Sequence, residues 1–185
     1  TEEMGVVNIY NSWNSMISVV ATLSLTSGGL QLAMKEFESE RNKYLSSVLS
    51  LTSLMAILLG AIYCAAPQLW NNLFGLPTAL MLLMVIHQLL FPAYDFWLMR
   101  QRYEYKYKSA GAVSIASAVL ASSVSVCAVI AASKAGIKQT GMVRLFANYS
   151  VQLAIALFLW IYIFVKGKTL YSKQFWRFSL ALSIP

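Results

Sequence analysis

Five long segments of this chain carry almost no charge, and each is long enough to cross a bilayer as a helix. They run from about residue 8 to 33, 45 to 66, 77 to 99, 109 to 133 and 145 to 165, whereas a crossing helix needs about 20 residues. Of the 14 Lys and Arg residues, all but three lie in three breaks: Lys35, Arg41 and Lys43; Arg100, Arg102, Lys106 and Lys108; Lys166, Lys168, Lys173 and Arg177. The sequence therefore predicts an all-α fold, a polytopic transmembrane helix bundle with about five spans.

The three basic breaks alternate with breaks that hold few charges, which gives the bundle a predicted orientation. Loops rich in Lys and Arg tend to stay cytoplasmic, so we expect the chain to start outside and end inside. Thr1 is not an initiator methionine, and residues 174 to 185 begin a fresh apolar stretch. We therefore expect residues 1 to 185 to be a partial transmembrane lobe, an internal part of a larger membrane protein, with the start of a further helix at 174 to 185.

Composition excludes most other classes of protein. The chain is 58% hydrophobic and 11% charged, whereas soluble domains are about a quarter charged. The net charge of +7 could indicate a nucleic-acid binder, but the charges lie at segment ends, so we expect a lipid bilayer and no nucleic acid as partner. Cys64 and Cys127 lie in apolar runs without metal-ligand spacing. We expect both to be small core residues and expect no metal site.

Several stretches carry a resemblance to a known family. They are the stretch from Glu3 to Tyr10, Ser27-Gly28-Gly29 at the end of the first segment, the basic and aromatic stretch from Trp97 to Lys108, and Lys166-Gly-Lys168 followed by Tyr171 to Phe178. In order and spacing the chain resembles, over essentially its whole length, the Wzx-type polysaccharide and O-antigen flippases of the MOP superfamily.

The resemblance implies a fold and a function. The five spans would be the second to sixth helices in one lobe of a two-lobed transporter of the bacterial inner membrane. That transporter would move an undecaprenyl-diphosphate-linked oligosaccharide to the outer leaflet by alternating access, without cofactors or catalytic residues. Polysaccharide polymerase and glycosyltransferases are the implied partners. One departure is that no Lys or Arg lies deep in the five spans, so cations for the diphosphate would come from other helices, or the substrate differs.

Polar residues recur at steps of three or four along the first span and so share one face of a helix. They are Asn8, Asn11, Ser15, Ser18, Thr22 and Thr26. This face is either a cavity wall that hydrogen-bonds sugar hydroxyls or a surface that bonds to adjacent helices. Gly28 and Gly29 near its inner end form a hinge, a close-packing point or a helix stop.

The third span holds the only acid clearly inside a span, Asp95, eight residues after His87. Charged residues inside membranes are costly and often functional, so one hypothesis is ion coupling, with Asp95 titrating and His87 relaying. The alternative is that Asp95 pairs with Arg100 or Arg102 at the inner interface, and that His87 is a hydrogen-bonded core residue.

Two further sets of residues are singled out. Small residues recur every fourth position in the fourth span, at Ala110, Ser114, Ala118 and Ser122, which favours close helix packing over cavity lining. The stretch that contains Arg100, Arg102, Tyr103 and Lys106 is predicted to lie at the cytoplasmic interface, where a lipid-linked substrate would enter, and to act as an anchor there.

Three classes of function remain open from the sequence. A lipid-linked oligosaccharide flippase is the first, a cation-coupled efflux carrier of the same superfamily is the second, and an integral-membrane transferase is the third. One His, one acid inside a span and short loops leave little room for a catalytic constellation, so we expect no enzyme.

Overall fold

The computed structural model describes residues 2–25, 29–136 and 140–183, and the side chains from residue 5 onward. Within these ranges the chain forms eight α-helices, one 3-10 helix and no strand. The helices are α1 Glu2–Ala21, α2 Gly29–Glu36, α3 Arg41–Ala65, α4 Pro67–Phe74, α5 Thr78–Tyr103, α6 Tyr107–Lys134, α7 Thr140–Gly167 and α8 Lys173–Ser183, with the 3-10 helix at Glu38–Glu40. The predicted all-α helix bundle is confirmed.

Four stretches in the described part of the chain are long and apolar enough to cross a membrane. They are Glu38–Ala65, Thr78–Tyr103, Tyr107–Lys134 and Thr140–Gly167, which match the second to fifth predicted spans. The helix that begins at Lys173 matches the further helix predicted over 174 to 185 as far as Ser183. The structure therefore agrees with the second to fifth predicted spans and not with the first.

The first predicted span, 8 to 33, is wrong as a single helix. α1 ends at Ala21 and α2 begins at Gly29, because Leu23 and Ser24 both adopt left-handed backbone conformations with φ of 54°. The N–H of Ser24 bonds back to the Val19 carbonyl at 3.0 Å, a pattern that closes a helix end. No charge or proline lies here, and Gly28 and Gly29 are the sequence feature nearest to the break. Thr26 and Gly28 lie outside the described residues.

The connection between α3 and α5 contains a short helix, α4. Pro67 begins α4 at its first position, where a missing N–H costs nothing. Gly75 ends α4 with a left-handed φ of 64°, which glycine adopts without strain. The side chain of Asn71 then accepts from Tyr63 at 3.2 Å and donates to Thr78 at 2.8 Å, so α4 is tied to α3 and α5.

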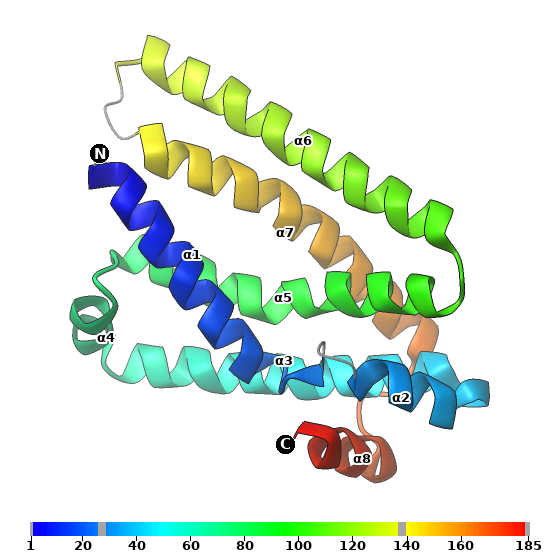
Figure 1. Ribbon diagram of the computed structural model, residues 1–185. Coiled ribbons are helices and arrows are strands. Elements are labelled where there is room, and N and C mark those ends of the chain that lie inside the picture. Colours follow the sequence, from blue (N-terminus) through cyan, green and yellow to red (C-terminus); the bar gives the residue numbers. More distant parts are fainter. Residues whose placement is uncertain (1, 26–28, 137–139, 184–185) are drawn as a thin grey trace.

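The helices pack around α3, α5 and α7 (Figure 1). α7 contacts α1, α3, α5 and α6. In Figure 1, α6 runs alongside α7 and diverges from α5 with distance from the α5–α6 connection. Large apolar side chains on α6 and α7 remain exposed, among them Ile115, Val119, Phe158 and Val165, as expected of helices that face lipid. Cys64 and Cys127 are also exposed, so the prediction that they are core residues is wrong.

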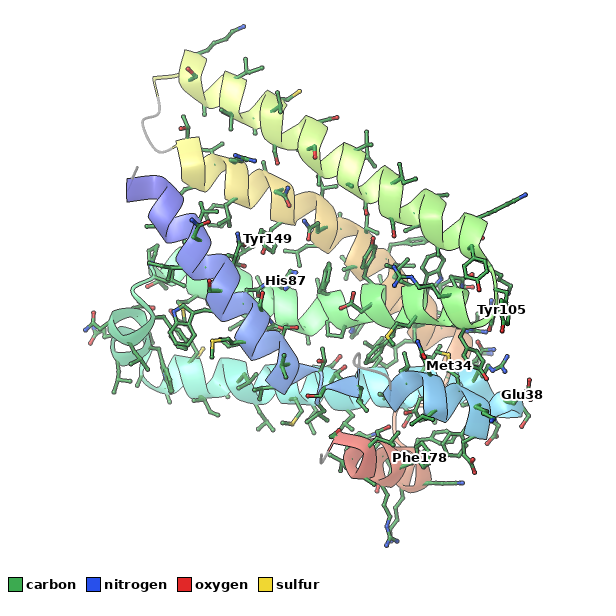
Figure 2. All side chains as sticks on the ribbon, in the orientation of Figure 1. Met34, Glu38, His87, Tyr105, Tyr149 and Phe178 are labelled. Atoms are coloured by element: carbon green, nitrogen blue, oxygen red, sulfur yellow. The ribbon has the colours of Figure 1, made fainter. Side chains whose placement is uncertain are left out.

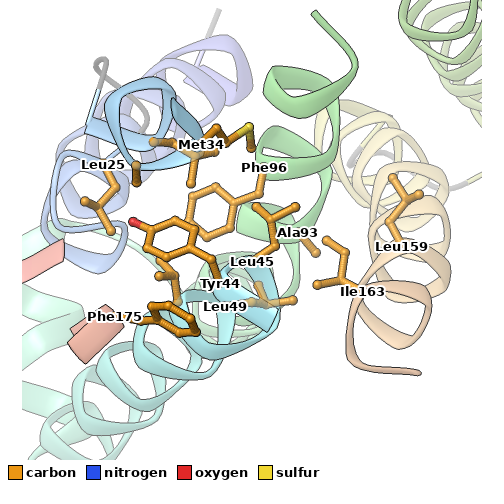
Figure 3. Packing of buried hydrophobic residues seen from close by; sticks show 13 residues of the cluster. Leu25, Met34, Tyr44, Leu45, Leu49, Ala93, Phe96, Leu159, Ile163 and Phe175 are labelled. Atoms are coloured by element: carbon orange, nitrogen blue, oxygen red, sulfur yellow. The ribbon is translucent and has the colours of Figure 1, made fainter. Parts of the chain in front are cut away.

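The three basic breaks lie at one end of the bundle, which we call the basic end. Arg100 donates to the Asn42 side chain, which joins the second break to the first. Ser46, near the first break, donates to the Thr169 carbonyl in the third at 2.9 Å. A cluster of buried side chains from α2, α3, α5, α7 and α8 fills this end, with Tyr44 among Met34, Phe96 and Phe175 (Figure 3). The three basic breaks, which are far apart in the sequence, thus lie together at one end of the molecule.

Candidate functional site

A polar groove lies between α5, α6 and α7, inside the stretches that are apolar enough to span a membrane. Its volume is about 360 Å³, which is within the range of small-molecule sites. Its walls are Phe91 and Tyr94 of α5, Ser114, Ser117, Ala118, Ala121 and Ser122 of α6, and Asn148, Gln152 and Ile155 of α7. Hydroxyl, amide and aromatic groups therefore line it, and none of these side chains is charged.

Hydrogen bonds fix part of the groove wall and leave other polar atoms available. The Tyr94 hydroxyl lies 3.1 Å from the Ser117 hydroxyl, and Ser117 donates to the Ser114 carbonyl at 2.9 Å. On α7, Gln152 Nε2 donates to Asn148 Oδ1. The described residues provide no hydrogen-bond partner for Asn148 Nδ2 or Gln152 Oε1, so one amide donor and one amide acceptor remain available for a neutral polar ligand.

This groove was not predicted from the sequence. The small residues Ser114, Ala118 and Ser122 line it, so the preference for packing over cavity lining was wrong for these three. Ala110 is buried as predicted, and the rest of the α6 packing stripe is Ser117, Ala121, Ser125 and Ala132. Asn148 and Gln152 lie four residues apart in an apolar segment, and this amide pair on one helix face is the signal that could have indicated the groove.

The polar face predicted for the first span lies on a flank of α1. Asn8, Asn11 and Ser15 are exposed, Ser18 is half-buried and Thr22 is buried. Ser15 donates to the Asn11 carbonyl at 2.9 Å and Thr22 to the Ser18 carbonyl at 2.8 Å, so these hydroxyls bond within their own helix. Asn11 reaches a neighbour, because Tyr149 of α7 donates to its Oδ1 at 3.1 Å.

α1 is tied to α5 by an asparagine that the sequence analysis did not select. Gln88 Nε2 donates to both the carbonyl and the side-chain oxygen of Asn14, at 3.0 and 2.9 Å, and both residues are buried. Asn11 and Asn14 therefore bond to neighbouring helices, which was the alternative interpretation of the polar residues in the first span.

Asp95 and His87 are not brought together. They are eight residues apart on one helix, about 12 Å along its axis. His87 stacks on Phe91 with ring centroids 4.4 Å apart and meets the Tyr149 ring edge-on at 5.1 Å; Figure 2 labels His87 and Tyr149 near mid-bundle. His87 is buried, and its Nδ1 has no hydrogen-bond partner among the described residues. It is a core residue as one interpretation predicted, but its Nδ1 forms no hydrogen bond in the described part of the chain.

The predicted ion pair between Asp95 and Arg100 or Arg102 is absent from the described part of the chain. Arg100 instead donates from Nε to Glu104 at 2.7 Å and from its terminal nitrogen to Asn42. The reason is spacing, because Glu104 lies one helical turn after Arg100 on the same face. Asp95 is half-buried in α5, and no described residue forms an ion pair or side-chain hydrogen bond with it.

Around Glu104, beyond the end of α5, the predicted interfacial residues form an ion-pair network. Lys106 donates to Glu104 Oε2 at 2.6 Å while Arg100 holds Oε1. Burial alone would raise the pKa of Glu104, but hydrogen bonds from Lys106 and Arg100, together with their charges, outweigh burial and lower it. Of the four residues predicted to lie at the interface, Arg100 and Lys106 therefore form ion pairs with Glu104. Arg102 and Tyr103 line an adjacent pocket.

Comparison of the chain with protein-family models, with curated proteins and with solved structures found no match. Within the described residues, no group of three or more His, Cys, Asp or Glu side chains is placed to hold a metal ion.

Proposed function

We propose that this chain belongs to a membrane transporter that moves a lipid-linked oligosaccharide, of the undecaprenyl-diphosphate type, to the outer leaflet by alternating access. The observation that carries the proposal is the uncharged polar groove between α5, α6 and α7. A sugar head group that crosses hydrocarbon leaves its hydroxyls unpaired, at a cost of roughly 2–7 kcal/mol for each. A path lined by hydroxyl and amide groups removes that cost.

The lining chemistry favours a neutral, hydroxyl-rich ligand over a charged one. Asn148 and Gln152 supply a donor and an acceptor, and Ser114 and Ser122 supply hydroxyls. Phe91 and Tyr94 supply flat ring surfaces at the same groove, against which the C–H face of a sugar can pack. Ala118 and Ser122 are exposed, so the groove is open at its side, as a head group attached to a lipid chain requires.

The test is complementation by the full-length protein in a bacterial strain that lacks its polysaccharide flippase. The unmodified protein is expected to restore surface glycan. Gln152→Leu removes one sugar hydrogen bond, worth about 0.5–1.5 kcal/mol, so we expect roughly threefold to tenfold less glycan at equal expression. Ser150→Ala is the control, because Ser150 is an exposed α7 residue outside the groove, bonded to its own helix. Failure of the unmodified protein to restore glycan would refute the proposal.

A second function, a cation-coupled efflux carrier, is favoured by one observation. Asp95 is a carboxyl group in a membrane-type helix that forms no ion pair with any described residue, and such groups often mark ion paths. Asp95→Asn in the full-length protein is then expected to abolish transport driven by a proton or sodium gradient. Transport that keeps its dependence on the gradient in this variant would exclude the coupling role.

A further inference from the structure

A large pocket lies at the basic end, between α2, the start of α3 and the α5–α6 connection. Its volume is about 990 Å³, and its lining includes Arg41, Arg102, Tyr103, Glu104, Tyr105 and Tyr107. Figure 2 shows Glu38 and Tyr105, which also line it, at the same end of the bundle. We call it the basic-end pocket. It is separate from the polar groove, because the two share no lining residue.

The pocket lining and its ion-pair partners together carry an excess of positive charge. Arg41 pairs with Glu38 at 3.0 Å, so these two charges compensate each other. Glu104 is held by two cations, Arg100 at 2.7 Å and Lys106 at 2.6 Å. Arg102 adds a further cation, exposed and without an ion-pair partner in the described residues. In the lining itself two cations, Arg41 and Arg102, balance the two carboxylates, and the excess of two cations comes from Arg100 and Lys106, which pair with Glu104 from outside the lining.

The walls of the pocket are held in place. Arg41 donates from Nε to the Met34 carbonyl at 3.1 Å, and its guanidinium lies 5.0 Å from the centroid of the Tyr103 ring. On the opposite wall Tyr105 has a left-handed φ of 57°, fixed by its N–H bond to the Arg102 carbonyl at 3.1 Å. The ion pairs on either side of Tyr105 hold this strained turn, so the pocket is preformed.

Tyrosine hydroxyls complement the free guanidinium. The rings of Tyr105 and Tyr107 meet edge to face with centroids 5.9 Å apart, and both side chains are exposed. Neither hydroxyl bonds to another described residue, so each can donate to an oxygen-rich anion. The Arg102 guanidinium and the two phenol donors line one pocket, and this combination suits a phosphate group, because Arg binds phosphate oxygens in a bidentate manner.

We propose that the basic-end pocket binds the phosphate group of an anionic membrane phospholipid, such as phosphatidylglycerol. The pocket lies where a membrane-spanning helix ends and next to the aromatic and basic residues typical of an interface. Basic pockets between helices on the cytoplasmic side of membrane proteins bind anionic lipid head groups. This site serves a lipid of the bilayer, so it goes beyond the proposed transport function and does not depend on it.

The experiment is a lipid titration of the purified full-length protein in detergent, followed by native mass spectrometry. Phosphatidylglycerol is expected to bind more tightly than phosphatidylcholine. Arg102→Gln is expected to lower the affinity for the first bound phosphatidylglycerol by about tenfold. This is the effect of losing one charge-assisted hydrogen bond to phosphate. Lys35→Gln is the matched control. It removes an exposed cation of α2 at the same end, outside the pocket, and is expected to leave the affinity unchanged.

Three results would overturn the proposal. Equal binding of the two lipids would show that the site does not select an anionic head group. Equal losses in Arg102→Gln and Lys35→Gln would show a diffuse effect of surface charge. Displacement of the bound lipid by millimolar inorganic phosphate would assign the pocket to soluble phosphate. An elution profile for Arg102→Gln that matches the unmodified protein establishes that this exposed substitution leaves the fold intact.

Discussion

Gly167→Ala tests the closest helix contact at the basic end, where the last residue of α7 meets the first turns of α3. A methyl group on Gly167 would overlap the Ser46 hydroxyl and the backbone carbonyl of Asn42. Ser46 cannot easily move away, because it bonds to the carbonyls of Lys43 at 3.1 Å and Thr169 at 2.9 Å. The Asn42 carbonyl belongs to the α3 backbone and has no rotamer to change.

The expected cost follows from these contacts. Overpacking of a close-packed site costs about 1–3 kcal/mol. Displacing Ser46 also breaks its bond to Thr169, which adds about 1 kcal/mol. A change of 1 kcal/mol shifts the Tm of a chain of this size by about 2–4 °C, so we expect Gly167→Ala to lower the Tm by about 5–15 °C.

The assay is thermal unfolding in detergent, followed by the loss of the monodisperse elution peak on heating. Gly111→Ala in α6 is the matched control, because no heavy atom lies within 4 Å of the position its methyl would take. Alanine there gains helix propensity of up to about 1 kcal/mol, so its Tm should be unchanged or higher. Equal Tm values for the two variants would refute the argument that Gly167 is required by close packing.

Two further predictions concern side chains at the same end. Because the native pKa of Glu104 lies below the ordinary value of 4.5, its ion pairs stabilise the fold fully above that value and lose their effect as pH falls through the native pKa. Glu104→Gln should therefore lower the Tm most at pH 7, and the loss should shrink as the pH falls below 4.5; a loss independent of pH would contradict this. Tyr44→Phe removes a buried hydrogen bond of 2.8 Å to Ser179 of α8, worth about 1 kcal/mol. Hydrogen exchange should become several-fold faster in α8 and stay unchanged in α6, and unchanged exchange in α8 would show that the bond does not hold that helix.

Much of the fold could be predicted because membrane insertion is a property of single segments. Four predicted spans correspond to helices that are long and apolar enough to cross a membrane, since each carries its own apolar residues in sequence order. The first span failed for a local reason. Leu23 and Ser24 adopt left-handed conformations for which neither residue has a preference, so these two residues did not indicate where the helix ends.

The candidate site was predicted less well. Serines of the fourth span could face a neighbouring helix or a cavity, and spacing alone does not distinguish these cases. The groove exists because α6 follows α7 and diverges from α5 (Figure 1), which leaves Ser114 and Ser122 beside Asn148 and Gln152. Arg100 was likewise assigned the wrong partner, because its pairing with Glu104 depends on where α5 ends.

The sequence by itself determined that this chain is an all-α, membrane-type bundle whose basic breaks alternate with apolar segments. Hydropathy and charge are sums over neighbouring residues, so they can be read without knowing what each segment touches. Only the tertiary structure decided that the three basic breaks meet at one end of the bundle, where the first two line one pocket, that the first segment is broken, and that a polar groove opens between α5, α6 and α7. These features depend on which helix faces meet, and that choice is made by packing between residues far apart in the chain.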